Sequence, residues 1–551
     1  MNGVARYFKV FLLTAIGLLS SISLNNHAQT TPVTSLDQHQ SSFFVKAIEV
    51  QGNFLLSDQE LDPYFAHLAG NEQTLADLEK AADAIQQAYR AAGYGGVVAF
   101  VPEQTMVDGN ITIQVVEGKI ANIQISGNKR ANEENILGSL PHVRKGETPS
   151  VRNIDRNVQM ANENPVKELR VALVAGAKPG EIDADIKVTD ERAWRLLFGV
   201  DSAGTPGTGN FRTNVGVQHA NLWNRDHIGT FQFQVSPTDP SRAQIYSVGY
   251  RIPLYNYFSA IDAFYAHSNV ESVTQATPVN VLGFTGKGDI AGFRAHRFLR
   301  RLGEYDHRMT FGWDWRSFNN NCAFGTSGSD ACGRATADVT ITPLSIGYAG
   351  QKAGPKFSMG INTNFSGNVG GSSDRAFDTI RPDAEKHYVV WRFFGFGNLT
   401  LPAGFGVSTR VAAQYSPHAL VPGEQFGMGG GGSAMGGIIS VRGYREREVV
   451  GDYGITFNLE GLGPDIAKFA KSENYSLRPI GFFDVGWAGN NHNMPCTVNN
   501  TSCTLAGVGG GIRFSIGKRF TGRLDFGHAL IDGNQKMAGT TRGHLAVNFI
   551  Y

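Results

Sequence analysis

The sequence predicts a membrane β-barrel that follows two small α/β units, and three observations support this fold class. The N-terminus has the features of a secretory signal peptide. A unit whose first and last segments are strands of alternating polar and apolar residues is then present twice. From Arg192 to the C-terminus, strand-like segments of about ten residues recur between Gly, Asn, Asp and Pro turns.

Composition agrees with this class. The 551 residues are enough for two or three domains, and charged residues make up only 18% of them. The net charge of +1 gives no sign of nucleic-acid binding. No run of about 18 apolar residues is present, which argues against transmembrane helices. Barrel strands alternate and never form such a run, so an outer-membrane barrel remains compatible with the sequence.

Residues 1–28 are predicted to be the signal peptide. Arg6 and Lys9 supply its positive charge, Val10–Leu19 is a short apolar core, and cleavage is expected after Ala28. The alternative, a membrane anchor helix, is disfavoured because the core is short and a polar run follows at once. Residues 29–43 are polar and are expected to be a flexible segment.

The four cysteines form two local pairs, Cys322 with Cys332 and Cys496 with Cys503. Each pair lies in Asn-, Ser- and Gly-rich sequence. Because an exported chain meets an oxidising environment, we expect two short-loop disulfides. A metal site is the less favoured alternative, since the spacing differs from that of a zinc ribbon and only His492 lies close.

The first half of the mature chain contains an internal repeat. Ile48–Asn53 is echoed by Ile123–Asn128, and each is an alternating strand that ends in a Gly-Asn turn. The two units also end on similar alternating strands. We therefore place the first unit at residues 44–118 and the second at residues 119–190.

Two helices are predicted inside the first unit. The shorter covers Ser57–Leu68, and the longer covers Leu75–Ala92 with apolar residues at helical spacing. Thr74, with Asp77 three residues later, is a suitable N-cap, and Gly93 is suited to the C-terminal end. Each unit therefore reads as strand, two helices and two strands.

Residues 191–551 are predicted to form the barrel. Thr230–Val235 alternates cleanly, with aromatic and branched residues on one face and Thr and Gln on the other. Four further segments read similarly: Ala243–Pro253, Arg308–Trp315, Tyr388–Leu401 and Gly404–Tyr415. Arg542–Tyr551 ends the chain on an aromatic residue, which is typical of outer-membrane barrels. A soluble β-sandwich or propeller is the alternative, and the signal peptide and closing strand argue against it.

Two short motifs lie within the barrel region. The first is Val441-Arg442-Gly443-Tyr444, preceded by a glycine-rich run and followed by Arg445–Glu448. The second is Phe482–Gly486, in strand-like sequence. Side chains alternate along a strand, so Phe482, Asp484 and Gly486 share one face. If the opposite, apolar face meets lipid, Asp484 points into the barrel, where the Arg442 guanidinium could reach it.

This pair of motifs resembles the two-partner secretion transporters of the outer membrane. This is the TpsB family of haemolysin activator and secretion proteins (ShlB, FhaC and CdiB are examples), related to the BamA insertase. The family carries a VRGY/F motif on a loop folded into the barrel and an FxDxG motif on a late strand. Both are present, and the resemblance extends from about Phe43 to Tyr551. It implies a barrel of about sixteen strands preceded by two POTRA domains.

The resemblance also implies a function. The chain would export a large partner exoprotein with an N-terminal secretion domain, such as an adhesin, a haemolysin or a contact-dependent inhibition toxin. Its POTRA domains would capture this client in the periplasm, and its other partners would be outer-membrane lipid and the barrel assembly machinery. The alternatives are a BamA-like insertase and an adhesive or binding barrel. The insertase has more than two periplasmic repeats, which favours the exporter.

A loop–barrel lock follows from the motifs. The Arg442 guanidinium can bind a carboxylate through two bonds, and Asp484 is the expected acceptor, with Asp525 as a second candidate. Gly443 would allow a tight turn, and Tyr444 would pack on the inner wall. In the alternative, Arg442 belongs to a solvated extracellular loop, as we expect of Arg445 and Arg447.

No catalytic motif accompanies these residues. The sequence has no P-loop, no GxSxG elbow and no HExxH helix, and its 14 histidines are scattered. We therefore predict a protein that is not an enzyme and that uses no cofactor or metal.

Overall fold

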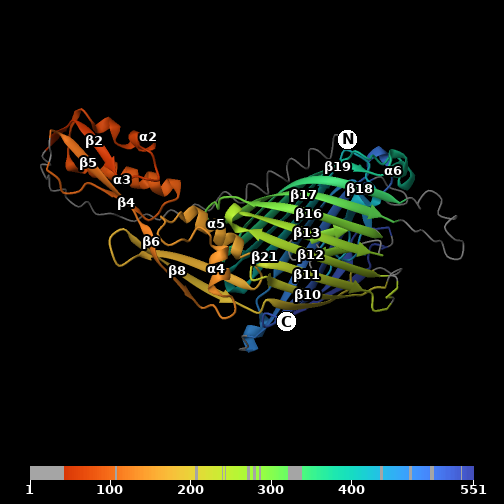
Figure 1. Cartoon of the computed structure of the whole chain (residues 1–551). Coiled ribbons are helices and arrows are strands. Elements are labelled where there is room, and N and C mark those ends of the chain that lie inside the picture. Colours follow the sequence, from red (N-terminus) through yellow and green to blue (C-terminus); the bar gives the residue numbers. More distant parts are fainter. Residues whose placement is uncertain are drawn as a thin grey trace.

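The computed structural model describes residues 42–105, 108–204, 209–238, 240–241, 243–269, 273–276, 281–284, 287–319, 338–434, 439–470, 474–496, 502–534 and 536–551. Two α/β units follow one another at one end of a closed barrel (Figure 1). The predicted signal peptide, residues 29–41 and the cysteines Cys322 and Cys332 lie outside the described residues. No helix in the described ranges is long and apolar enough to cross a membrane.

The first α/β unit contains one three-stranded sheet. Its strands, in spatial order, are β2 (Ala47–Gln51), β5 (Asn110–Glu117) and β4 (Val97–Phe100). β5 runs parallel to β2 and antiparallel to β4. A short pair, β1 (Phe43–Val45) with β3 (Asn71–Gln73), lies beside it.

The long helix of this unit, α3 (Leu75–Ala92), has the predicted bounds. Thr74 and Asp77 form a capping box at its start, and Gly93 ends it with a left-handed φ of +106°. Its apolar stripe packs on the sheet and includes the buried residues Leu78 and Ile85. The sequence therefore determines this helix at both ends.

The shorter predicted helix is only partly confirmed. Of Ser57–Leu68, only α2 (Asp58–Leu61) is α-helical, and the 3₁₀ turns Asp62–Tyr64 and Ala66–Leu68 follow it. Pro63 has no N–H and cannot continue the α-helical hydrogen bonds, so the prediction of one continuous helix was wrong.

The second unit repeats the topology of the first. Its strands, in spatial order, are β6 (Lys119–Ser126), β8 (Glu181–Asp190) and β7 (Lys167–Ala175), and its helices are α4 (Glu133–Ser139) and α5 (Val151–Ala161). As in the first unit, the last strand lies in the middle, parallel to the first strand and antiparallel to the other.

Sixteen antiparallel strands close into the barrel, as predicted. In order they are β9 (Trp194–Asp201), β10 (Arg212–Leu222), β11 (His227–Val235), β12 (Gln244–Leu254), β13 (Ser259–Ser268), β16 (Gly288–Phe298), β17 (Tyr305–Phe318), β18 (Val339–Lys352), β19 (Phe357–Gly371), β20 (Val389–Thr400), β21 (Gly406–Tyr415), β24 (Tyr453–Leu462), β25 (Tyr475–Gly489), β26 (Ser502–Ile516), β27 (Phe520–Ala529) and β28 (Thr541–Ile550). β28 pairs with β9 and completes the ring.

Alternation along the strands gives the barrel an apolar outer face and a polar inner face. On β11, Gln232 and Gln234 are buried, whereas Phe231 is 48% exposed on the outside. On β25, Phe483 and Trp487 likewise point outward, opposite to the buried Asp484. The predicted faces of both strands are therefore confirmed, and this pattern is the one that a barrel in lipid requires.

The two ends of the barrel differ. At the near end, beside the α/β units, the connections are short except for residues 463–474 between β24 and β25, whereas longer connections cross the far end (Figure 1). One far-end connection holds the hairpin β14 (Val273–Ala276) and β15 (Val281–Phe284), and another holds α6 (Asp374–Ile380). A third, residues 416–452 between β21 and β24, turns into the lumen and is called here the in-turned loop. It contains a small hairpin, β22 (Phe426–Met428) and β23 (Val449–Gly451).

The second α/β unit and the near end of the barrel share one buried joint. Lys167 Nζ lies 2.6 Å from Asp226 Oδ2 in the β10–β11 turn, and both side chains are almost fully buried. Asn135 Nδ2 also donates to Asp226, and so does the Tyr255 hydroxyl. Burial lowers the pKa of the Lys167 ammonium, and the Asp226 carboxylate opposes this shift. The apolar core of the unit continues into Tyr255 and Phe258 of the barrel.

We expect Lys167→Ala to loosen this joint. Removing one partner of a buried ion pair costs about 3–5 kcal/mol because the Asp226 carboxylate is left without its cation. Amide hydrogen exchange of residues 223–226 would then accelerate. Arg170→Ala is the matched control, because Arg170 lies on the same strand with its side chain 80% exposed. Equal exchange rates in the two variants would show that the ion pair does not hold the joint.

Candidate functional site

The tip of the in-turned loop, Val441–Tyr444, is buried against the inner wall of the barrel. Gly443 adopts a φ of +101°, which L residues with a side chain rarely adopt. A Cβ at this position would also lie 3.1 Å from the backbone nitrogen of Ala529 on β27. Glycine is therefore required at this position by both conformation and space.

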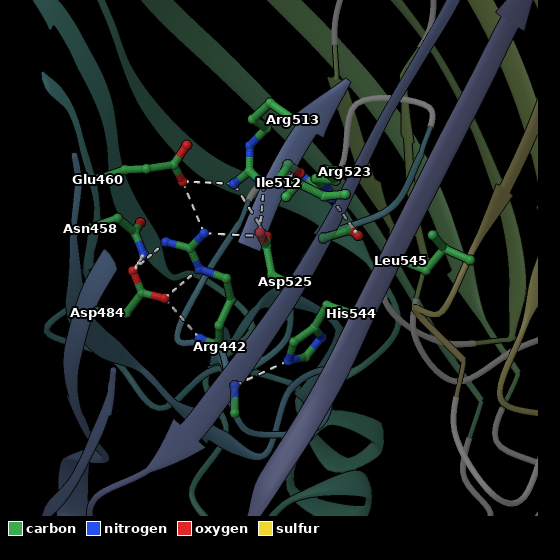
Figure 2. A network of polar contacts seen from close by, with 12 residues as sticks. Arg442, Asn458, Glu460, Asp484, Ile512, Arg513, Arg523, Asp525, His544 and Leu545 are labelled. Carbon is green, nitrogen blue, oxygen red and sulfur yellow. Dashed lines mark hydrogen bonds and ion pairs between the residues drawn. The ribbon is translucent and has the colours of Figure 1, made fainter. Parts of the chain in front are cut away.

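Arg442 contacts Asp484 of β25 through three hydrogen bonds (Figure 2). Its Nε donates to Oδ2 at 2.7 Å and its Nη2 to Oδ1 at 2.9 Å, so the guanidinium and the carboxylate meet in a two-bond pair. The Arg442 backbone N–H donates to the same Oδ2 at 3.0 Å. Both side chains are fully buried, so the contact is not screened by bulk water.

Two further carboxylates face the same guanidinium. Nη1 of Arg442 donates to Glu460 of β24 at 2.9 Å and to Asp525 of β27 at 3.3 Å. Arg513 of β26 bridges these two carboxylates, at 2.8 Å from Glu460 and 2.5 Å from Asp525 (Figure 2). The loop tip is thus held by a network of charges from four consecutive strands, not by a single pair.

Neighbouring groups orient this network. Asn458 donates to Asp484 Oδ1 at 2.8 Å and to the Ser440 carbonyl oxygen at 2.7 Å. The Phe482 ring lies against the guanidinium, with 3.4 Å between its centre and Arg442 Cζ, a cation–π arrangement. The Phe482 side chain therefore supports the same arginine that Asp484 binds.

The residues on either side of Arg442 also contact the wall. The Gly443 N–H donates to Nε2 of His544 on β28 at 3.1 Å. The Tyr444 hydroxyl lies 2.8 Å from the Ala506 carbonyl oxygen and 2.6 Å from that of Ile531. Val441 packs with Tyr444 in an apolar cluster of loop and barrel residues.

Three glycines on the inner wall leave room for the loop. A Cβ at Gly486 on β25 would lie 3.1 Å from Val441 Cγ2, and one at Gly527 on β27 would lie 2.4 Å from the Gly443 backbone nitrogen. A Cβ at Gly507 on β26 would lie only 2.1 Å from the Arg442 carbonyl oxygen. The glycine of the FxDxG motif therefore has a physical role: a Cβ there would crowd Met428 and Val441 of the in-turned loop, and also Thr456 of β24.

The model of the haemolysin secretion/activation protein family ShlB/FhaC/HecB matches residues 180–514, and that of the ShlB-type POTRA domain matches residues 43–118. The chain belongs to the ShlB/FhaC/HecB family. It is therefore an outer-membrane transporter of two-partner secretion, with its near end in the periplasm and its far end outside the cell.

Individual relatives are distant in sequence. The heme/hemopexin transporter protein HuxB of Haemophilus influenzae (strain 86-028NP) is 22% identical over 89% of this chain and 84% of its own length. The outer membrane transporter CdiB of Dickeya dadantii is 21% identical over 79% and 75%. The solved structure of CdiB from Escherichia coli superposes with a TM-score of 0.73 at 20% identity, covering 95% of this chain and 93% of that one. This structural similarity to CdiB shows that the two chains share a fold.

In this transporter the structure brings together all seven predicted motif residues, and Asp525 lies next to them. Sequence analysis missed Glu460, Asn458, Arg513 and His544. A signal existed for the first two, because Asn458 and Glu460 alternate with apolar residues on the strand directly after the loop. Arg513 reaches Glu460 and His544 reaches Gly443 across more than fifty residues of sequence, so no local pattern reveals these two contacts.

The expectation for Arg445 and Arg447 was wrong. Both are half-buried in the lumen and do not lie in a solvated loop. Arg447 donates to the carbonyl oxygens of Pro422 and Gln425 on the opposite arm of the in-turned loop. The residues that follow the Val441–Tyr444 motif run back beside the N-terminal part of the in-turned loop, because β23 pairs with β22.

A disulfide joins Cys496 to Cys503 at the extracellular end, which confirms one of the two predicted bridges. Both cysteines pack in the apolar cluster that contains Tyr444. The bridge therefore supports the wall against which the loop tip rests.

We expect Cys496→Ser combined with Cys503→Ser to destabilise this end of the barrel. Closure of so short a chain segment contributes about 2–3 kcal/mol in the chain-entropy description. The temperature at which the folded barrel loses its compact electrophoretic mobility would fall. Thr504→Ser, at an exposed position on the same strand, is the control and would leave that temperature unchanged. An unchanged temperature in the double variant would contradict the prediction.

Proposed function

We propose that this transporter exports one large exoprotein whose N-terminal segment is captured by its periplasmic units. One relative is described as a heme/hemopexin transporter protein and another as an outer membrane transporter, CdiB. We accordingly place the client among adhesins, haemolysins and contact-dependent inhibition toxins. We assign residues 44–118 and 119–190 to two POTRA domains, since the second unit repeats the topology of the first.

Capture is proposed to occur at a sheet edge. β4 lies at the edge of the first sheet and carries Val98 and Phe100, which are 53% and 43% exposed. An extended segment can add to such an edge through backbone hydrogen bonds while its side chains meet exposed apolar groups. The buried joint at Lys167 would keep the second unit fixed on the barrel, so the captured segment would be delivered to a constant position.

The in-turned loop is proposed to close the lumen between clients. The observation that carries this proposal is the fully buried pair of Arg442 and Asp484, with Glu460 and Asp525 beside it. A barrel of sixteen strands is wide enough for an aqueous channel, so an exporter needs a device that obstructs it. We name the contact of Val441–Tyr444 with the wall the loop–barrel lock.

No chemical reaction is part of this proposal. Transport through the lumen needs positioning and displacement of the loop, for which the lock suffices without a catalyst or cofactor. Outer-membrane lipid would cover the apolar outer face, and the barrel assembly machinery would insert the chain.

Comparison of secreted and outer-membrane proteomes, with and without this gene, tests the proposal. We expect one or a few very large proteins to disappear from the medium while the outer membrane stays unchanged. A broad fall in many barrel proteins would indicate a BamA-like insertase instead. Loss of cell adhesion with normal secretion would indicate an adhesive barrel.

A further inference from the structure

A second group of buried charges holds the other arm of the in-turned loop. Glu424 lies in a 3₁₀ turn, Pro422–Glu424, and its side chain is 1% exposed. Arg316 of β17 donates to its Oε1 at 2.5 Å, and Arg392 of β20 donates to its Oε2 at 2.8 Å. One carboxylate of the loop thus bridges two arginines of the barrel wall.

This contact is separate from the loop–barrel lock. Its arginines lie on β17 and β20, whereas the partners of Arg442 lie on β24, β25 and β27. Gln414 of β21 adds a hydrogen bond to the Glu424 carbonyl oxygen at 2.9 Å. The preceding residues, Leu420 and Val421, are buried in an apolar cluster with residues of this wall. The loop is therefore fixed to two different parts of the barrel.

The barrel wall around Glu424 carries more positive than negative side chains. Arg294, Arg316 and Arg392 face this region, and Asp314 pairs with the first two at 2.5 and 2.6 Å. Without Glu424, the cluster would retain three arginines and one carboxylate. Arginine stays charged, and a poorly hydrated charge without a partner is unfavourable. If Glu424 leaves, the wall favours another carboxylate in its place.

The same pattern occurs at the periplasmic mouth of the lumen. Glu163, in the connection after α5, bridges Arg251 of β12, at 2.5 Å, and Arg308 of β17. These residues line a cavity of about 310 Å³ together with Phe394 and Phe396 of β20. Here too a carboxylate from outside the wall covers two wall arginines.

We propose that these wall arginines bind carboxylate side chains of an extended segment of the exported polypeptide, and that Glu424 and Glu163 occupy their positions when no client is present. A client that carries Asp or Glu would replace Glu163 at the periplasmic mouth and then Glu424 nearer the exterior. Each exchange substitutes one charged hydrogen-bonded pair for another, so the arginines are never left without a partner. This inference rests on the exporter function proposed above.

Planar-bilayer recordings on the purified full chain test the inference. E424Q keeps the size of the side chain and removes its charge, so we expect a higher basal conductance than in the wild type. Two extended peptides are then added on the periplasmic side, one of alternating Ser and Glu and one of alternating Ser and Gln. Because bonds between charged groups are stronger than neutral ones, the glutamate peptide should block current at about tenfold lower concentration.

Substitution of the arginines provides the decisive comparison. Arg316→Gln with Arg392→Gln, in the E424Q background, should reduce the advantage of the glutamate peptide to the part that Arg251 and Arg308 supply at the periplasmic mouth. Arg392→Gln in the otherwise unchanged chain should make the advantage of the glutamate peptide smaller than in the wild type. This single variant keeps the test available if the triple variant fails to insert. D374N is the control, because Asp374 is an exposed carboxylate at the start of α6, in the far-end connection between β19 and β20.

Equal block by both peptides in E424Q, or an advantage that the arginine substitutions leave undiminished, would overturn the inference. These outcomes are distinct from failure of the proposed function. If the chain were not an exporter, the secreted proteome would be normal without it. If only the arginine site were wrong, the exoprotein would be missing in the gene deletion, while the two peptides would block alike.

Discussion

Arg442→Ala is expected to reduce secretion of the exoprotein by about tenfold or more while the barrel still inserts. The substitution leaves Asp484, Glu460 and Asp525 buried with one cation fewer, and breaking such a pair from one side costs about 3–5 kcal/mol. Without this anchor the loop no longer has one closed position that an entering client displaces, so client arrival and channel opening are no longer coupled. Immunoblots of medium and outer membrane, with heat-modifiable mobility to report folding, measure both quantities.

Matched variants separate the lock from a general effect of losing a lumenal arginine. Arg447→Ala removes the same residue type from the same loop. Arg447 bonds only to carbonyl oxygens and is in no ion pair among the described residues, so secretion should fall much less. Arg442→Lys keeps the charge but loses the two-bond geometry and should give an intermediate result.

A charge exchange gives a second check on the same pair. Asp484→Ala should resemble Arg442→Ala. The combination of Arg442→Asp with Asp484→Arg should restore only part of the loss, since Glu460 and Asp525 would then face a third carboxylate. Wild-type secretion from Arg442→Ala and Asp484→Ala would refute the loop–barrel lock.

Much of the fold could be predicted because its signals are local. Alternation on β11 and β25 determines which side chains face lipid, and the capping residues around α3 determine where that helix begins and ends. The shorter helix of the first unit was predicted less well, since Pro63 acts through the backbone while the apolar spacing continues past it.

The contact between Arg442 and Asp484 could also be anticipated, because strand alternation places Asp484 on the inner face and the motif places Arg442 on a flexible loop. The rest of the charge network could not. Arg513 meets Glu460, and Glu424 meets Arg392, because the closed ring of sixteen strands brings these distant parts of the sequence together. Such contacts depend on barrel register, which a single strand does not encode.

Gly507→Ala is expected to displace the loop tip without changing any charge. The new Cβ would lie 2.1 Å from the Arg442 carbonyl oxygen, a distance that forces the loop backbone away from β26. The strand itself can accept alanine, because Gly507 does not have a positive φ. We therefore expect a folded barrel whose secretion defect approaches that of Arg442→Ala.

Gly481→Ala is the control for this steric test. Gly481 lies on the neighbouring strand β25 at an exposed position, and its Cβ would meet no atom within 4 Å. A secretion defect in Gly507→Ala but not in Gly481→Ala would separate loop position from loss of glycine in the wall. Combining Gly507→Ala with Arg442→Ala should add little, since both changes release the same tip. Normal secretion by Gly507→Ala would mean that close seating of the tip on β26 is not needed for export, and the charge network alone would then have to explain any effect of Arg442.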